Sequence, residues 1–89
     1  DAATLSLVHE SERLIGAAVA ARTVRCRVRA EGSVLELDAA ALAAIAPQRR
    51  DELAGEVGGI FAAAGFPRPV SFAPYRNGSA FLVRDNERS

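Results

Sequence analysis

The chain has 89 residues, of which 49% are apolar and 25% charged, and its 11 arginines are balanced by 11 acidic residues. This length suits one domain, residues 1–89, with a single hydrophobic core. The balanced charge argues against bulk electrostatic binding to nucleic acid. One cysteine and one histidine exclude a disulfide within the chain and a zinc site built from this chain alone.

No apolar run in the sequence approaches the roughly 20 residues of a membrane-spanning helix. We therefore expect a cytoplasmic protein that does not bind membranes. The chain starts at Asp1 rather than at a methionine, and we expect it to be a piece of a longer protein.

The first predicted element is a helix over residues 1–21, because apolar residues recur there at intervals of three and four. Its expected N-cap is Thr4. The stripe of this helix consists of Leu5, Val8, Ile15 and Val19, with Leu7, Leu14 and Ala18 beside it, and Ser11 and Glu12 share its helical spacing. The residues expected on its outer face are His9, Glu10, Glu12 and Arg13.

Residues 23–38 form the most informative stretch, because apolar and basic residues alternate strictly in its first half. Alternation with a period of two predicts a strand with one buried face and one solvent face. The solvent face carries a row of three guanidiniums spaced about 6.5–7 Å apart; this arginine row consists of Arg25, Arg27 and Arg29. Glu31 and Gly32 are the expected tight turn, with glycine supplying a positive φ. A second strand is predicted over residues 33–38.

Two further helices and two strands are predicted downstream. Asp38 is the expected N-cap of a helix over residues 39–46, and a helix that starts at Pro47 runs to Ala64, with Gly65 as its C′ residue. Close approach to the sheet is the simplest use for three glycines of that helix, Gly55, Gly58 and Gly59. Strands are expected over residues 70–73 and 80–83.

These elements predict an α+β domain in the order α-β-β-α-α-β-β. Its sheet has three or four strands and is antiparallel or mixed, and the helices pack on one face of it.

Two interpretations of the arginine row are open. Forked guanidinium donors match the oxygens of a phosphate, so the row suits a phosphate site. The alternative is a solvated strand face whose arginines pair with acidic residues of the neighbouring strand or turn. The acidic residues in reach are Glu31, Glu36 and Asp38.

The other reactive residue types do not form a catalytic set. Cys26 alternates with Val24 and Val28 on the apolar side of its strand, so we expect a buried, unreactive thiol. His9 is expected on the surface, without metal-ligating neighbours. The sequence contains no nucleophile–base set, no paired catalytic carboxylates, no Walker-type loop and no GxGxxG motif. We therefore expect no catalytic or metal-binding residue and no cofactor bound by this chain itself.

Four segments of the chain resemble one protein family. Residues 27–38, RVRAEGSVLELD, resemble the RVRxHGDLARIE segment in the C-terminal domain of LarE-type ATP-dependent sacrificial sulfur transferases. Residues 75–79, YRNGS, resemble the closing GYRxGSMN of that family, although on their own they would also suit an ordinary Asn-Gly turn. Residues 8–12 and 64–66 are similar to its VExAE helix and its LGF segment. The four matches follow the family's order and nearly its spacing.

The resemblance implies the C-terminal, phosphate- or mononucleotide-binding and oligomerisation domain of a sulfur transferase of the PP-loop family, which acts in the biosynthesis of the nickel-pincer nucleotide cofactor. It implies that Arg27 and Arg29, with Arg25 beside them, hold phosphate. The resemblance also matches Asp38 to an acidic residue of the family's segment, and Arg76 and Ser79 to its closing motif. It assigns no particular role to Arg76 and Ser79, and the three are candidates for site support. ATP and Mg²⁺ belong to the PP-loop domain, which these residues lack, and Cys26 does not match the sacrificial cysteine. Glu36 stands where the family has arginine.

The alternative function is a stand-alone, non-enzymatic interaction module. In that case a sheet edge or the glycine-rich helix would form a homo-oligomer, and phosphate would not bind. For both functions we expect that nucleic acid is not a partner of the chain.

Overall fold

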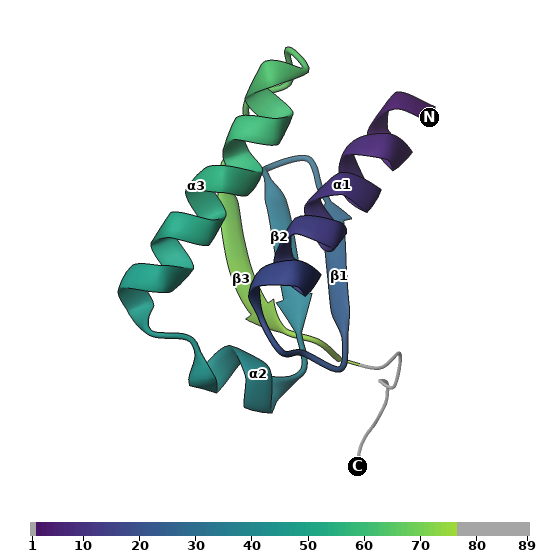
Figure 1. Ribbon diagram of the computed structural model, residues 1–89. Helices are drawn as coiled ribbons and strands as arrows, with labels where there is room; N and C mark the ends of the chain where they lie inside the picture. The colour runs from purple at the N-terminus through teal and green to yellow at the C-terminus, as the bar shows by residue number, and fades with distance from the viewer. Residues whose placement is uncertain (1, 77–89) are drawn as a thin grey trace.

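The computed structural model describes residues 2–76 of the chain. They form six elements in the order α1 (Ala2–Ala18), β1 (Val24–Val28), β2 (Ser33–Leu37), α2 (Ala39–Ala44), α3 (Pro47–Ala63) and β3 (Val70–Pro74) (Figure 1). This combination confirms the predicted α+β class. The predicted strand over residues 80–83 lies outside the described residues.

The three strands form one mixed sheet in the order β1-β2-β3. The central strand, β2, is antiparallel to β1 and parallel to β3. A parallel pair needs a long crossover connection, and α2 and α3 provide it between β2 and β3. The helices lie on one face of the sheet, with α1 beside β1 and α3 beside β3 (Figure 1).

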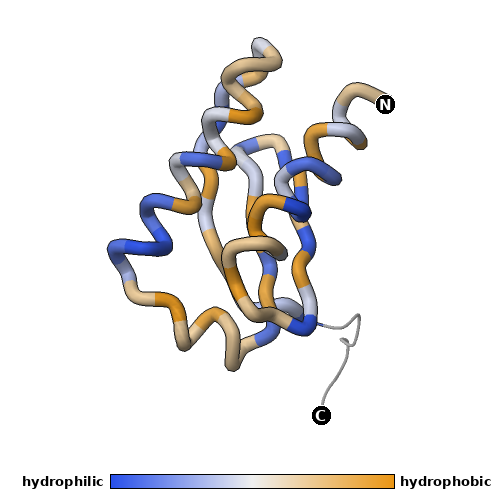
Figure 2. Tube along the Cα trace, viewed as in Figure 1, coloured by the Kyte–Doolittle hydropathy of each residue, from blue (hydrophilic) through white to orange (hydrophobic). Residues whose placement is uncertain are grey.

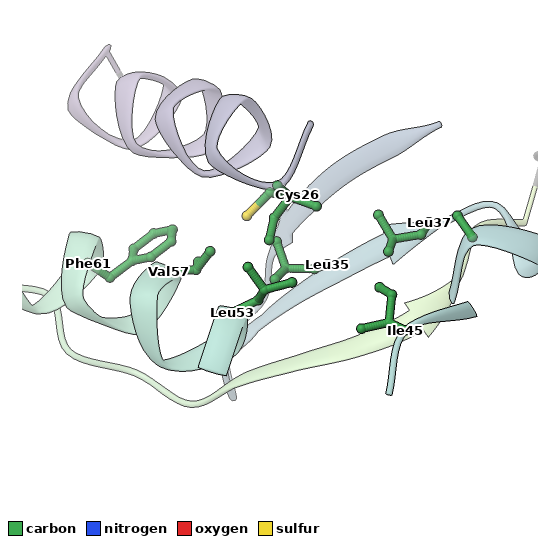
Figure 3. Packing of buried hydrophobic residues seen from close by; sticks show 9 residues of the cluster. Cys26, Leu35, Leu37, Ile45, Leu53, Val57 and Phe61 are labelled. Carbon is green, nitrogen blue, oxygen red and sulfur yellow. The ribbon is translucent and has the colours of Figure 1, made fainter. Parts of the chain in front are cut away.

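The hydrophobic core lies between this face of the sheet and the helices. Leu53, Val57 and Phe61 of α3 face Leu35 and Cys26 of the sheet (Figure 3). The remaining buried apolar residues of the core are Ile15, Leu37, Ala41 and Ile45. Along β1, hydrophobic and hydrophilic residues alternate as the sequence predicts (Figure 2). None of the helices within residues 2–76 is long and apolar enough to cross a membrane.

The β1–β2 turn differs from the prediction in position and in the role of its glycine. The Arg29 amide donates to the Gly32 carbonyl at 2.9 Å, so the turn consists of Ala30 and Glu31. Gly32 does not have a positive φ. A Cβ on Gly32 would lie 2.8 Å from the carbonyl oxygen of Pro69, which accepts a hydrogen bond from the Ser33 amide. Close approach of two backbones therefore requires this glycine.

The glycines of α3 only partly follow the prediction. A Cβ on Gly58 would contact Val70 of β3, whereas a Cβ on Gly55 or Gly59 would meet open space. Close approach to the sheet is thus the wrong explanation for Gly55 and Gly59. Gly65 has a φ of 80° after the end of α3, which confirms its predicted C′ role.

Helix α1 also departs from its predicted pattern. It begins at Ala2, so Thr4 lies in its first turn and the predicted N-cap is wrong. Leu5 is 55% exposed although it belongs to the predicted apolar stripe. Glu12, predicted on the outer face, is half-buried, and its carboxylate accepts a hydrogen bond from the Cys26 amide at 2.9 Å. The face of α1 toward β1 is therefore partly polar.

Alanine substitutions at Gly32 and Gly55 should have opposite effects on stability. Gly32→Ala forces Cβ against backbone and should lower the free energy of unfolding by about 1–3 kcal/mol. Gly55→Ala enters open space in a helix and should raise it by about 0.5–1 kcal/mol. Urea unfolding followed by circular dichroism measures both. A Gly32→Ala variant as stable as the wild type would contradict the described approach of Pro69.

Candidate functional site

One face of the sheet is not covered by any helix of residues 2–76 (Figure 1). Because side chains alternate along strands, this uncovered face takes the residues that lie between the core positions. They are Arg25 and Arg27 of β1, Val34 and Glu36 of β2, and Ser71 and Ala73 of β3. The cationic residues all come from β1, so the charge of this face is concentrated at one edge of the sheet.

Glu36 holds two members of the arginine row by ion pairs. Its Oε1 lies 3.0 Å from Arg27 Nε, and its Oε2 lies 3.6 Å from Arg29 Nη2. The Glu36 side chain is only 14% exposed, whereas those of Arg27 and Arg29 are 42% and 53% exposed. A largely buried carboxylate between two guanidiniums holds them in place, while both cations still reach solvent.

Arg25 is the third member of the row and remains unpaired. The strand register places it directly opposite Glu36, yet its exposed side chain has no hydrogen bond or ion pair within residues 2–76. Only two of the three guanidiniums therefore share the Glu36 carboxylate. Of the acidic partners considered from the sequence, Glu36 alone pairs with the arginine row among the described residues. The row therefore retains two excess positive charges.

The sequence analysis missed Arg68, a cation that contacts the backbone of the arginine row. Its Nη2 donates to the Arg29 carbonyl oxygen, and its guanidinium lies 4.4 Å from the centroid of the Phe66 ring. Its Nε is buried and has no hydrogen-bond partner among the described residues. The sequence could have pointed to Arg68 through its position between Pro67 and Pro69, since two prolines restrict the backbone from which its side chain projects.

The residues predicted to support the site lie elsewhere or outside the described part. Asp38 accepts hydrogen bonds from the amides of Arg22, Thr23 and Ala41, so its carboxylate caps α2 and ties it to the segment before β1. The bond from Thr23, with those from Arg22 and Ala41, lowers the pKa of Asp38, while desolvation opposes this effect. Arg76 is exposed beyond the end of β3. Ser79 lies outside the described residues.

Cys26 does not provide a nucleophile. Its side chain is buried among core residues, and burial, with a smaller contribution from the nearby Glu12 carboxylate, raises the pKa of the thiol to about 11. A protonated, buried thiol is unreactive at neutral pH. Residues 2–76 also contain no group of three His, Cys, Asp or Glu side chains placed to hold a metal ion. The geometry of the arginine row is suited to binding an anion.

Comparison with known proteins gives no matching family model, no similar curated protein and no similar solved structure.

The buried thiol predicts a specific loss of stability at alkaline pH. The native thiol keeps its proton up to about pH 11, whereas the thiol of the unfolded chain loses it near pH 8.5–9. The protonated Cys26 thiol makes its full contribution to the free energy of unfolding below about pH 8.5. This contribution should fall by roughly 2–3 kcal/mol as the pH rises toward 11. Urea unfolding of the wild type and Cys26→Ala across pH 8–11 tests this. Identical pH slopes in the two proteins would contradict it.

The capping carboxylate of Asp38 predicts an opposite dependence at acidic pH. Because the pKa of Asp38 is lower in the folded state, its carboxylate makes its full contribution to the stability of the fold above about pH 4. This contribution is lost as the pH falls through the folded pKa. Asp38→Ala should therefore lower the melting temperature at pH 7, and its difference from the wild type should shrink below pH 4. Asp51→Ala, at an exposed position of α3, is the control. An Asp38→Ala effect no larger than the control's would contradict the capping role.

Proposed function

We propose that this chain is the C-terminal domain of a LarE-like ATP-dependent sacrificial sulfur transferase, and that it binds the phosphate of a mononucleotide or a similar small molecule. The observation that carries the proposal is the uncovered arginine row, in which Glu36 orients Arg27 and Arg29 while Arg25 has no ion pair within residues 2–76. Guanidiniums held in place bind phosphate oxygens through two parallel hydrogen bonds at a smaller entropic cost. The resemblance of residues 27–38 and 75–79 to that family supports the same assignment.

In this proposal, residues 2–76 bind an anion and contribute no nucleophile or free general base. Cys26 is protonated and buried, and the row contains no general base besides Glu36, which is engaged by two guanidiniums. In the proposed enzyme, adenylylation and sulfur transfer belong to the PP-loop domain. This domain would hold a phosphate group at the edge of the sheet.

The proposed site can be tested by NMR titration with pyrophosphate, AMP and nicotinate mononucleotide. We expect saturable shifts of the amides of residues 24–30. The Arg27→Ala/Arg29→Ala double variant should lose roughly tenfold or more in affinity, since each charge-assisted hydrogen bond contributes about 1.5–3 kcal/mol.

The control is Arg13→Ala/Arg49→Ala, which removes the same charge from exposed positions of α1 and α3. It should bind nearly as well as the wild type. Absence of saturable shifts with all three ligands, or equal losses in both double variants, would contradict the proposed site.

A second candidate function is self-association through the edge of β3. The Pro69 carbonyl and the Tyr75 amide bond to β2, so the alternating pattern of a parallel ladder directs the backbone groups of Val70 and Phe72 away from β2. These groups have no hydrogen-bond partner within residues 2–76. An unpaired edge can pair with another strand, and this favours the homo-oligomer that both sequence-based hypotheses expect.

A further inference from the structure

A hollow of about 240 Å³ lies between α1 and β1, the strand that bears the arginine row. It is lined by Leu5, Val8, His9 and Glu12 of α1 and by Arg25 and Arg27 of β1. The side chain of Cys26, which also borders it, points toward the helices, whereas those of Arg25 and Arg27 point to the uncovered face. The hollow therefore follows the edge of β1 and reaches the arginine row.

Glu12 closes the inner side of this hollow. Arg29 pairs with Gly32 across the hairpin, so the alternation of an antiparallel ladder directs the Cys26 amide away from β2. Glu12 Oε2 accepts the hydrogen bond of that amide at 2.9 Å. Its second oxygen, Oε1, has no partner within residues 2–76 and can accept a hydrogen bond from a bound molecule.

The lining determines which kind of group the hollow can accept. A carboxylate would repel a second anion there but would accept hydrogen bonds from hydroxyl groups. The imidazole of His9 adds a further hydrogen-bonding group, and Leu5 and Val8 provide an apolar wall. Leu5 is 55% exposed, although it lies on the apolar stripe of α1. An uncharged group with hydroxyls and an apolar side fits this lining.

The volume of the hollow indicates the size of the group that it can hold. At about 30 Å³ per water in the liquid, its volume equals that of roughly eight waters. A pentose ring with its hydroxyls fits within this volume. The nearby Arg25 and Arg27 lie where a phosphate attached to that ring would meet positive charge.

We propose that the hollow is the sugar subsite of a pentose 5-phosphate group. The phosphate binds Arg25 and Arg27, and the sugar lies along Leu5 and Val8 with its hydroxyls toward Glu12 and His9. This inference rests on the phosphate site proposed above and assigns the part of the ligand that adjoins the phosphate.

The test compares ribose 5-phosphate with inorganic phosphate, measured by NMR titration of the 89-residue chain. We expect ribose 5-phosphate to bind roughly five- to tenfold more tightly and to shift the amides of residues 8–12. The Leu5→Ala/His9→Ala double variant should remove this difference and leave the affinity for inorganic phosphate unchanged. Both positions are exposed, so the fold should tolerate the substitutions. Glu10→Ala, an exposed neighbour outside the hollow, should behave as the wild type.

The outcomes separate this inference from the function on which it rests. Equal affinities for the two ligands, without shifts in residues 8–12, would overturn the sugar subsite and leave the phosphate site in place. Tighter binding of ribose 5-phosphate that survives in Leu5→Ala/His9→Ala would also overturn it, because the sugar would then lie elsewhere. If neither ligand binds, the phosphate site fails and the subsite fails with it.

Discussion

Burial of one face of the sheet under the helices determines on which face the charged residues of its strands lie. The central strand β2 places Ser33, Leu35 and Leu37 under the helices, and both neighbouring strands follow its register. Every second residue of β1 must then point to the opposite face, and those residues are arginines. The concentration of cations on the uncovered face is thus a direct consequence of packing all three helices on one side.

Glu36 is the second determinant, because it turns a row of mobile cations into an ordered one. A carboxylate that is only 14% exposed needs polar partners. Arg27 donates a hydrogen bond to it, and Arg29 forms an ion pair with it at 3.6 Å. In return, the two guanidiniums lose conformational freedom before any ligand arrives, which lowers the entropic cost of binding. Glu36 also neutralises part of their charge, so the row attracts anions less strongly than three isolated arginines would.

The sequence predicted the parts of this fold that depend on periodicity and on local capping. The alternation in β1, the role of Asp38 as the cap of α2 and the role of Gly65 after α3 are all confirmed. Tertiary contacts account for what it missed. Gly32 is required by the approach of Pro69, which is 37 positions away, and no local pattern reveals such a contact.

The same distinction applies to the candidate site. The sequence identified the arginine row and included Glu36 among its alternative partners, because neighbouring strands bring such residues together. It did not identify Arg68, which reaches Arg29 from the connector before β3. It also placed Glu12 on the outer face of α1, whereas this carboxylate accepts a hydrogen bond from the Cys26 amide of β1. The placement of one element against another decided both positions.

The most direct test of this account is the NMR signal of the arginine side chains, observed through their Nε–Hε groups without ligand. If Glu36 orders the row, the Hε proton of Arg27 should exchange slowly with water, and its chemical shift should differ from that of a free arginine side chain. The Hε signal of Arg25 should resemble that of a solvent-exposed arginine. Glu36→Gln should move the Arg27 signal toward that of Arg25. Rapid exchange of Arg27 in the wild type, indistinguishable from Arg25, would contradict the claim that Glu36 orders the arginine row.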